Sequence, residues 1–189
     1  MAPHLNASSE VKQIIIPGNQ KFPNNIDLPV IVYQAILNVP ASGESEFIKG
    51  IFEQNGWSNS WTDSIYTYHH YHSNTHEVVG VSRGRCMLLL GGDDSILTTL
   101  EKGDVVLIPA GVSHKNVGSS DDFECVGAYP KGADYDMMRG EPGERELAEQ
   151  NIKAVPIPET DPVFGNMGPV LEHWSGQTNK KAIETRPQF

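Results

Sequence analysis

The sequence predicts an all-β protein of antiparallel strands, with a few short helices at its periphery. Apolar segments of five to eight residues follow one another closely between residues 65 and 129. Turn-forming residues separate them, and the 189 residues include 18 glycines and 13 prolines, a composition that favours short strands over long helices. Closely spaced antiparallel strands bury one face and protect their edges by curling, so we expect a jelly-roll barrel or a sandwich.

The N-terminal part is expected to contain two strands and one helix. Residues 14–16 and 29–37 are rich in β-branched side chains and are predicted as strands. A helix is predicted from Ser42 to about Asn55, because Ser42 is a suitable N-cap, acidic residues follow it, and Gly56 is a suitable stop.

Six strands are predicted in the central part, at 65–72, 77–83, 85–90, 95–100, 104–108 and 123–129. Glycine and aspartate residues at 91–94 and 101–104 predict hairpin turns. A second helix is predicted from residue 142 or 143 to about 152, and the Pro- and Gly-rich segment 155–174 is expected to pack in an extended form.

The chain length favours a single domain that spans residues 1–189. We expect its barrel core at about 60–130, N-terminal strands and a helix at 14–56, and a C-terminal helix with an extended tail at 140–189. Cys86 and Cys125 both lie in apolar runs and are expected to be buried free thiols.

Charge and hydropathy exclude several classes of partner. The formal net charge is −10, and the 14 Lys and Arg residues form no cluster, which argues against a nucleic-acid surface and against binding to anionic membranes. The N-terminus lacks the pattern of a secretory signal, and no segment approaches the ~20 apolar residues of a membrane span. We therefore expect a cytoplasmic protein that binds neither nucleic acid nor membranes.

Four side chains of the types that bind metals occur in this strand-like sequence: His70, His72, Glu77 and His114. Side chains alternate along a strand, so His70 and His72 would share one face of the predicted strand 65–72. Glu77 opens the next predicted strand, and His114 follows a predicted turn. We expect the four side chains to reach one ion.

Neighbouring residues leave alternatives open. A register slip or bulge would put His69 or His76 in place of His70, or make either one a hydrogen-bond partner of a ligand; otherwise they are surface or turn residues. Tyr66 and Tyr68 share the predicted face of the histidines. Tyr68 is a candidate catalytic residue that positions substrate or donates a proton, and core packing is the alternative.

Charged and aromatic residues near these motifs also allow two interpretations. Trp57 and Trp61 either line a pocket or anchor the packing beside the barrel. Arg83, Arg85 and Lys115 are either anion partners or parts of solvated turns.

These residues match both sequence motifs of the cupin superfamily, the double-stranded β-helix proteins similar to germin. The first motif is matched by His70-x-His72-x4-Glu77-x6-Gly84, with Ser64 in place of its leading glycine. The second is matched by Gly103-x5-Pro109-x-Gly111-x2-His114, with Gly118 in place of its final asparagine. The resemblance implies a double-stranded β-helix barrel and the four metal ligands named above.

Within the cupins, the chain resembles the small YjlB-like proteins of bacteria and fungi. The resemblance extends over about residues 14–175 and is carried by HHYHSNTHEVVG (69–80), PAGVSHK (109–115), GAYP (127–130) and DPVFGNMGP (161–169). It implies a homodimer, because cupins often pair through their sheets, and it implies no particular substrate.

The expected ligand set indicates metal chemistry. Three neutral imidazoles and one carboxylate leave two positions of an octahedral ion open, which suits Fe(II) or Mn(II) best and is also compatible with Ni(II) or Zn(II). We expect a metal-dependent oxidoreductase of dioxygenase type that acts on a small oxygenated metabolite, with Glu77 as ligand and catalytic base. The alternatives are a metal-dependent isomerase, decarboxylase or hydrolase, and a non-catalytic module that senses a small ligand or the metal.

Overall fold

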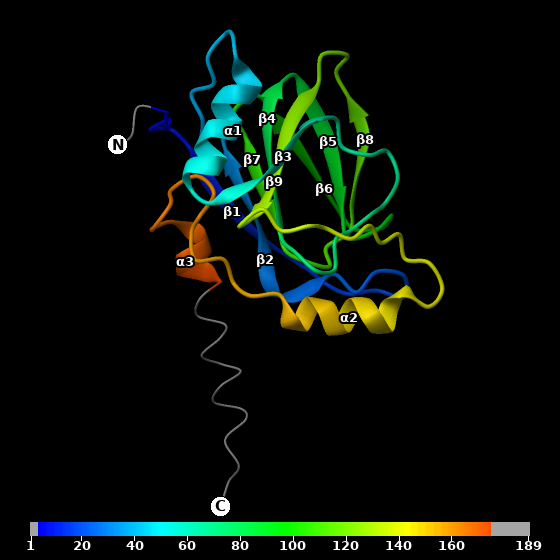
Figure 1. Cartoon of the computed structure of the whole chain (residues 1–189). Helices are drawn as coiled ribbons and strands as arrows, with labels where there is room; N and C mark the ends of the chain where they lie inside the picture. The colour runs from blue at the N-terminus through cyan, green and yellow to red at the C-terminus, as the bar shows by residue number, and fades with distance from the viewer. Residues whose placement is uncertain (1–3, 175–189) are drawn as a thin grey trace, which may run out of the picture.

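The computed structural model describes residues 4–174 (Figure 1). Within this range nine strands form two antiparallel sheets, and three short helices accompany them. This confirms the predicted all-β fold class of antiparallel strands with a few short helices. The two sheets face each other as a sandwich and do not close into a continuous barrel. Residues 1–3 and the part of the predicted tail beyond residue 174 lie outside the described residues.

The larger sheet contains six of the nine strands. Its strand order is β1 (Glu10–Ile16), β2 (Asn25–Gln34), β7 (Val105–Ile108), β4 (Glu77–Arg83), β9 (Glu124–Pro130) and β3 (Trp57–Asp63). The three-stranded sheet has the order β6 (Ile96–Glu101), β5 (Arg85–Leu90) and β8 (His114–Ser119). The β5–β6 and β6–β7 connections coincide with the two predicted turns.

Alternation along the strands divides the buried apolar side chains into two main cores. In β7, Val105 and Leu107 pack into the core beneath helix α1 (Glu44–Gln54), whereas Val106 and Ile108 face the three-stranded sheet. The second core also contains Cys86 and Cys125, which are buried free thiols as predicted. It therefore lies between the two sheets.

Helix α1 covers the outer face of the six-stranded sheet. Ile48, Ile51 and Phe52 are its buried residues, and Gly80 of β4 makes room for them, because a Cβ at Gly80 would lie 2.8 Å from the Ile48 side chain. The prediction that Ser42 caps this helix is wrong. Its N-cap is Gly43, at φ 68°, with no side-chain cap.

Two further helices follow the sandwich in the chain. Helix α2 (Glu144–Ala154) confirms the second predicted helix and lies along one end of the sandwich (Figure 1). The segment 155–174 is not extended throughout, because Pro169 at the first helical turn starts the five-residue helix α3 (Pro169–His173). Among the described residues, no helix is both long and apolar enough to cross a membrane.

The predicted strand 65–72 is wrong. Only two isolated bridges occur there, because His70 pairs with His114 while Tyr71 pairs with Met138. Neighbouring backbone groups thus bond to two different segments, and no ladder with a single partner strand can form. The place at the sheet edge beside β9 is taken by β3, which the sequence analysis did not predict because WSNSWTD is largely polar.

Candidate metal centre

Three buried histidines converge near one end of β4. His70 and His72 come from the segment before β4, and His114 is the first residue of β8. The backbones of His70 and His114 exchange two hydrogen bonds, of 3.2 and 2.9 Å. One potential ligand nitrogen from each of the three imidazoles lies within 4.8 Å of the others. The structure therefore brings together the three histidines that the sequence analysis selected.

The backbone fixes the orientation of each imidazole. The Nδ1 of His70 lies 3.3 Å from the carbonyl oxygen of Tyr68, and the Nδ1 of His114 lies 3.1 Å from that of Val112. The Nδ1 of His72 likewise faces the carbonyl of Asp136. Carbonyl oxygens only accept hydrogen bonds, so each Nδ1 carries the proton and each neutral ring keeps its lone pair on Nε2. Metal-binding histidines are oriented in the same way.

Glu77 completes the group at the floor of the site. Its Oε1 lies 3.6 Å from Nε2 of His72, and its Oε2 lies 3.3 Å from Nε2 of His114. The carboxylate is 3% exposed. Glu77 adjoins two of the three histidines, and it shares its strand phase with Val79 and Val81, which face the core between the sheets.

The protonation of these groups is coupled. Burial disfavours a charged carboxylate, yet the imidazoles of His72 and His114 hold the pKa of Glu77 well below its usual range. Burial opposes protonation of His72 too, but the nearby negative charge of Glu77 raises its pKa. Burial and then the neighbouring His114 lower the pKa of His70 to about 3. Glu77 is therefore an anion that lacks a fixed cationic partner.

The donor set fits a divalent ion. In the described part of the chain, no group donates a hydrogen bond to Oε2 of Glu77. A buried, incompletely paired carboxylate is costly, and lone pairs directed at it add repulsion. A cation between these atoms would satisfy Oε2 and the Nε2 lone pairs together. His70, His72, His114 and Glu77 are the side chains that would hold it.

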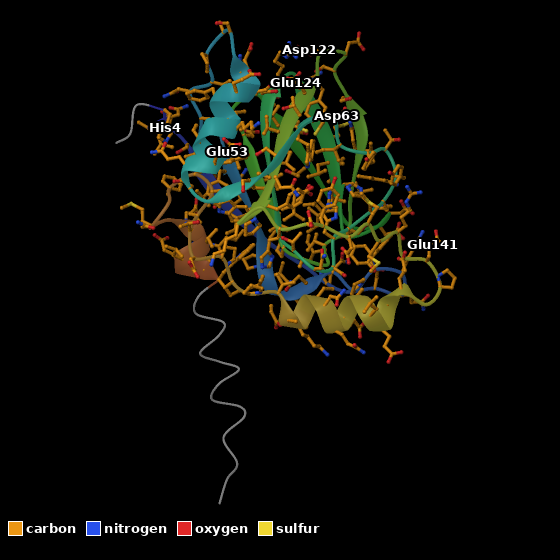
Figure 2. The ribbon with its side chains drawn as sticks, viewed as in Figure 1. His4, Glu53, Asp63, Asp122, Glu124 and Glu141 are labelled. Atoms are coloured by element: carbon orange, nitrogen blue, oxygen red, sulfur yellow. The ribbon has the colours of Figure 1, made fainter. Side chains whose placement is uncertain are left out.

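The candidate ligands line a cavity of about 260 Å³. Its wall is rich in aromatic and apolar side chains, which include Ile65 and Val79. Asp63 adds a carboxylate, and Figure 2 labels it at the end of β3, on the same side of the molecule as Glu124. Apolar walls with a few polar groups are typical of small-molecule sites. The aromatic and sulfur-containing residues of the wall are Trp61, Tyr66, Tyr129, Tyr135 and Met137.

Tyr129 of β9 is a site residue that the sequence analysis missed. Its hydroxyl donates a hydrogen bond of 2.8 Å to Oε1 of Glu77 and accepts one of 2.9 Å from the indole of Trp61. Burial, followed by the charge of Glu77, raises the pKa of Tyr129, so the hydroxyl stays protonated as a donor. The register of β4 and β9 could have indicated it. Val78 pairs with Ala128, so Glu77 and Tyr129 occupy the next position along the two antiparallel strands.

The segment 133–140, which we call the strap, passes beside the site. Asp136 and Met138 attach it to the body of the protein: Oδ1 of Asp136 accepts from the amide of Ser73 at 2.6 Å, and Met138 exchanges two backbone hydrogen bonds with Tyr71. The side chains of Tyr135 and Met137 instead line the cavity. No sequence pattern indicated that this loop contributes to the site.

Tyr68, the predicted catalytic tyrosine, does not line the cavity, whereas Tyr66 does. The two rings are stacked, with centroids 4.8 Å apart. The guanidinium carbon of Arg139 lies 4.1 Å from the centre of the Tyr68 ring. The neighbouring Tyr68 is the main cause that raises the pKa of Tyr66; burial, Tyr135 and Asp63 act in the same direction, and Arg139 opposes them. A catalytic role for Tyr68 stays a prediction.

His69 and His76 lie outside the three-histidine cluster. The Nδ1 of His69 lies 3.0 Å from Oγ of Ser113, and its Nε2 lies 3.0 Å from Oδ1 of Asp93. The Nδ1 of His76 accepts a hydrogen bond from the amide of Ala110, and its ring packs against Trp174. Both are therefore hydrogen-bonded within loops, as expected if they are turn residues and not metal ligands.

The other candidate residues are also placed. Lys115 pairs with Asp93 and Arg83 with Glu124, and neither cation lines the cavity, nor does Arg85. Trp61 lines the cavity, whereas Trp57 is buried in the core beneath α1.

No family model matches this chain. The chain is similar to the uncharacterized protein YjlB of Bacillus subtilis strain 168, with 42% identity over 165 residues. That alignment covers 87% of this chain and 97% of YjlB.

Three solved structures illustrate the structural similarities. An acireductone dioxygenase from Bacillus anthracis, with a cadmium ion in its active centre, has a TM-score of 0.34 and 17% identity over 48% of this chain and 60% of that one. The epimerase RmlC of Legionella pneumophila has a TM-score of 0.36 and 14% identity over 74% and 82% of the two chains. A DUF861-family protein of Thermotoga maritima has a TM-score of 0.32 and 19% identity over 52% and 96%.

Proposed function

This chain belongs to the family of the Bacillus subtilis protein YjlB, and we propose that it is a divalent-metal-dependent enzyme of dioxygenase type acting on a small oxygenated molecule. One observation carries the proposal. Three imidazoles whose Nδ1 atoms face backbone carbonyls converge, and two of them, His72 and His114, adjoin a buried carboxylate with an unsatisfied oxygen. We further propose a cytoplasmic homodimer.

The donor types favour a metal with open coordination positions. His70, His72, His114 and Glu77 would fill four positions of an octahedral Fe(II) or Mn(II) ion, and Ni(II) or Zn(II) fits the same donors. When bound, Fe(II) or Mn(II) supplies Lewis acidity and one-electron redox chemistry.

The surrounding residues bind the substrate and move its proton. The cavity of about 260 Å³ admits one small molecule. Glu77 is the base at this floor: its carboxylate accepts the proton that a substrate hydroxyl releases. The hydroxyl of Tyr129 holds Oε1, so Oε2, which lies beside His114, is the oxygen left to accept the proton.

The test combines metal analysis with oxygen consumption. Purified protein is expected to contain about one Fe or Mn per chain and to consume dioxygen with at least one member of a panel of small hydroxy acids, enediols and dihydroxybenzenes. His72→Ala should lose both the metal and the oxygen uptake. His69→Ala is the matched control, because His69 bonds to Ser113 and Asp93, and it should keep the metal.

Two outcomes would overturn parts of this proposal. A protein that binds no divalent metal, or that binds it equally well as the His72→Ala variant, has no such centre. Metal and ligand binding without any oxygen uptake would support the alternative of a non-catalytic binding module. Circular dichroism of each variant separates loss of the site from loss of the fold.

A further inference from the structure

Arg139 of the strap lies over a pair of stacked rings that borders the cavity. Tyr135 and Met137 line the cavity, while Asp136 and Met138 bond to the body of the protein. Arg139 follows Tyr135 and Met137 at the same spacing of two residues. Its guanidinium lies over Tyr68, whose ring stacks on the cavity residue Tyr66. The cation thus lies on an aromatic platform whose other ring, that of Tyr66, lines the cavity.

The charge of Arg139 has no ion-pair partner among residues 4–174. The nearby carboxylate of Glu144 is already engaged, because its Oε2 accepts hydrogen bonds from the backbone amides of Arg139, Gly140 and Glu141 at 2.8–3.0 Å. By contrast, Lys115 and Arg83, two of the three predicted anion partners, are paired with Asp93 and Glu124. A guanidinium that is exposed, oriented and unpaired is suited to binding a carboxylate.

The shape of the cavity restricts the rest of the ligand. Tyr135 is 43% exposed and Tyr66 is 50% exposed, although both line the cavity, so their ring surfaces are available to a ligand. Tyr135 also stacks on Tyr129 with a ring separation of 4.6 Å, which limits its rotation. The volume of about 260 Å³ is below the roughly 300–1,000 Å³ of drug-sized pockets. A flat molecule of about one ring matches these limits.

We propose that the ligand of this cavity is a small planar anion: vicinal oxygen atoms at one end reach the metal centre, the ring lies against Tyr135 and Tyr66, and a carboxylate at the other end pairs with Arg139. This inference rests on the proposed function, because the inner end of the ligand needs the metal. Asp63 also lines the cavity and repels a carboxylate on the ligand. That carboxylate therefore stabilises binding only where it reaches Arg139.

The test compares two probes that share a dihydroxybenzene ring and differ by one carboxylate, catechol and 3,4-dihydroxybenzoate. Titration calorimetry uses the full chain loaded with Zn(II), which has no redox chemistry and so prevents turnover. The carboxylate is expected to lower the Kd about tenfold, as a charge-assisted bidentate pair does. Arg139→Gln should remove this difference and leave the Kd of catechol unchanged. Higher salt should reduce the difference.

Two further variants separate the charge and ring contributions. Arg85→Gln removes the same charge at a distance from the candidate centre. Arg85 begins β5, whereas Leu90, which pairs with His114, ends it. This variant should preserve the tenfold preference. Tyr135→Leu should raise the Kd of both probes about fivefold, the size of one aromatic contact. Equal Kd values for the two probes in the wild type, or a preference that persists in Arg139→Gln, would refute the anion site. A Tyr135→Leu variant with unchanged affinities would refute the planar site.

Metal content is measured in the same samples, which separates this inference from the proposed function. Zn(II) bound at about one per chain with neither probe binding overturns the ligand class and leaves the metal centre intact. Absence of bound Zn(II) overturns both.

Discussion

Glu77 has two carboxylate oxygens in different surroundings. Oε1 accepts the hydroxyl of Tyr129, whereas Oε2 lacks a hydrogen bond among the described residues. The sequence predicted Glu77 as a ligand because its spacing from His72 matches a known motif. The sequence could not predict Tyr129, because the two residues are 52 positions apart and become neighbours only through the pairing of β4 with β9.

Tyr129→Phe should weaken metal binding without unfolding the protein. Loss of the hydroxyl frees Oε1 and lets the carboxylate rotate, so we expect the metal Kd to rise about 10–100-fold in a chelator competition assay. Tyr33→Phe is the matched control, because it also removes a hydroxyl that donates to a buried carboxylate, that of Asp161. It should cost about 1–3 kcal/mol in urea unfolding and leave the metal Kd unchanged. A Kd that changes equally in both variants would contradict a specific role for Tyr129.

His76 should make the protein less stable in acid. Burial lowers its folded-state pKa to about 4, below the ~6.5 of an unfolded histidine, so the unfolded chain binds more protons between these values. The free energy of unfolding should therefore fall by up to about 3 kcal/mol as the pH drops from about 6.5 to about 4.

His76→Asn tests this assignment, because asparagine retains an acceptor for the amide of Ala110 and does not titrate. Urea unfolding at several pH values should give a flatter profile for the variant than for the wild type. Parallel profiles would show that other groups cause the acid sensitivity.

At the level of elements, β3 and β9 together form one wall of the site. The indole of Trp61 lies over Gly127, where a Cβ would come within 2.1 Å of the ring. This close approach lets Trp61 reach the hydroxyl of Tyr129. A glycine at this strand position is therefore required by packing, and not by backbone conformation.

Gly127→Ala should displace Trp61 and thereby disturb the site. We expect a loss of about 1–3 kcal/mol in the free energy of unfolding, from overpacking, and a change in tryptophan fluorescence. Gly50→Ala in α1, where a new Cβ would meet no atom within 4 Å, is the control and should not destabilise the protein. Unchanged stability and fluorescence in Gly127→Ala would mean that the wall rearranges freely.

The segment 65–72 shows where periodicity misleads. Its β-rich composition predicted a strand, yet the backbone divides its hydrogen bonds between His114 and Met138. His70 and His72 still converge, since the bridges made by His70 and Tyr71 suffice to orient this segment. Sequence alternation therefore selected the histidines that converge, and not His69, although the element it assumed is absent. Contacts of the strap had no periodic signal and could not be predicted.

The strap should depend on Asp136. Asp136→Ala removes the acceptor for the amide and hydroxyl of Ser73, so hydrogen exchange in residues 133–138 should accelerate and the metal Kd should rise several-fold as the carbonyl that orients His72 becomes mobile. Asp134→Ala removes the same charge from the same loop, and only the backbone carbonyl of Asp134 accepts a hydrogen bond, from Asn74. Equal exchange rates in the two variants would contradict the anchoring role of Asp136.

At the scale of the whole molecule, the fold class was predictable because short apolar runs follow one another between turn-forming residues. β4, β7 and β9 are buried on both faces and send alternate residues into the two cores, so their sequences are apolar almost throughout. The strand order was not predictable, because it depends on pairings such as β2 with β7 that join distant segments. The same pairings assemble the candidate centre from β4, β8, β9 and two loops.

The central claim is that His70, His72, His114 and Glu77 bind one divalent metal ion. A crystal structure of the Fe(II)- or Mn(II)-loaded protein, with the ion located by anomalous diffraction, tests it most directly. We predict one ion about 2.0–2.3 Å from Nε2 of each histidine and from Oε2 of Glu77. An ion bound elsewhere, or one whose ligands do not include His114 or Glu77, would contradict this account.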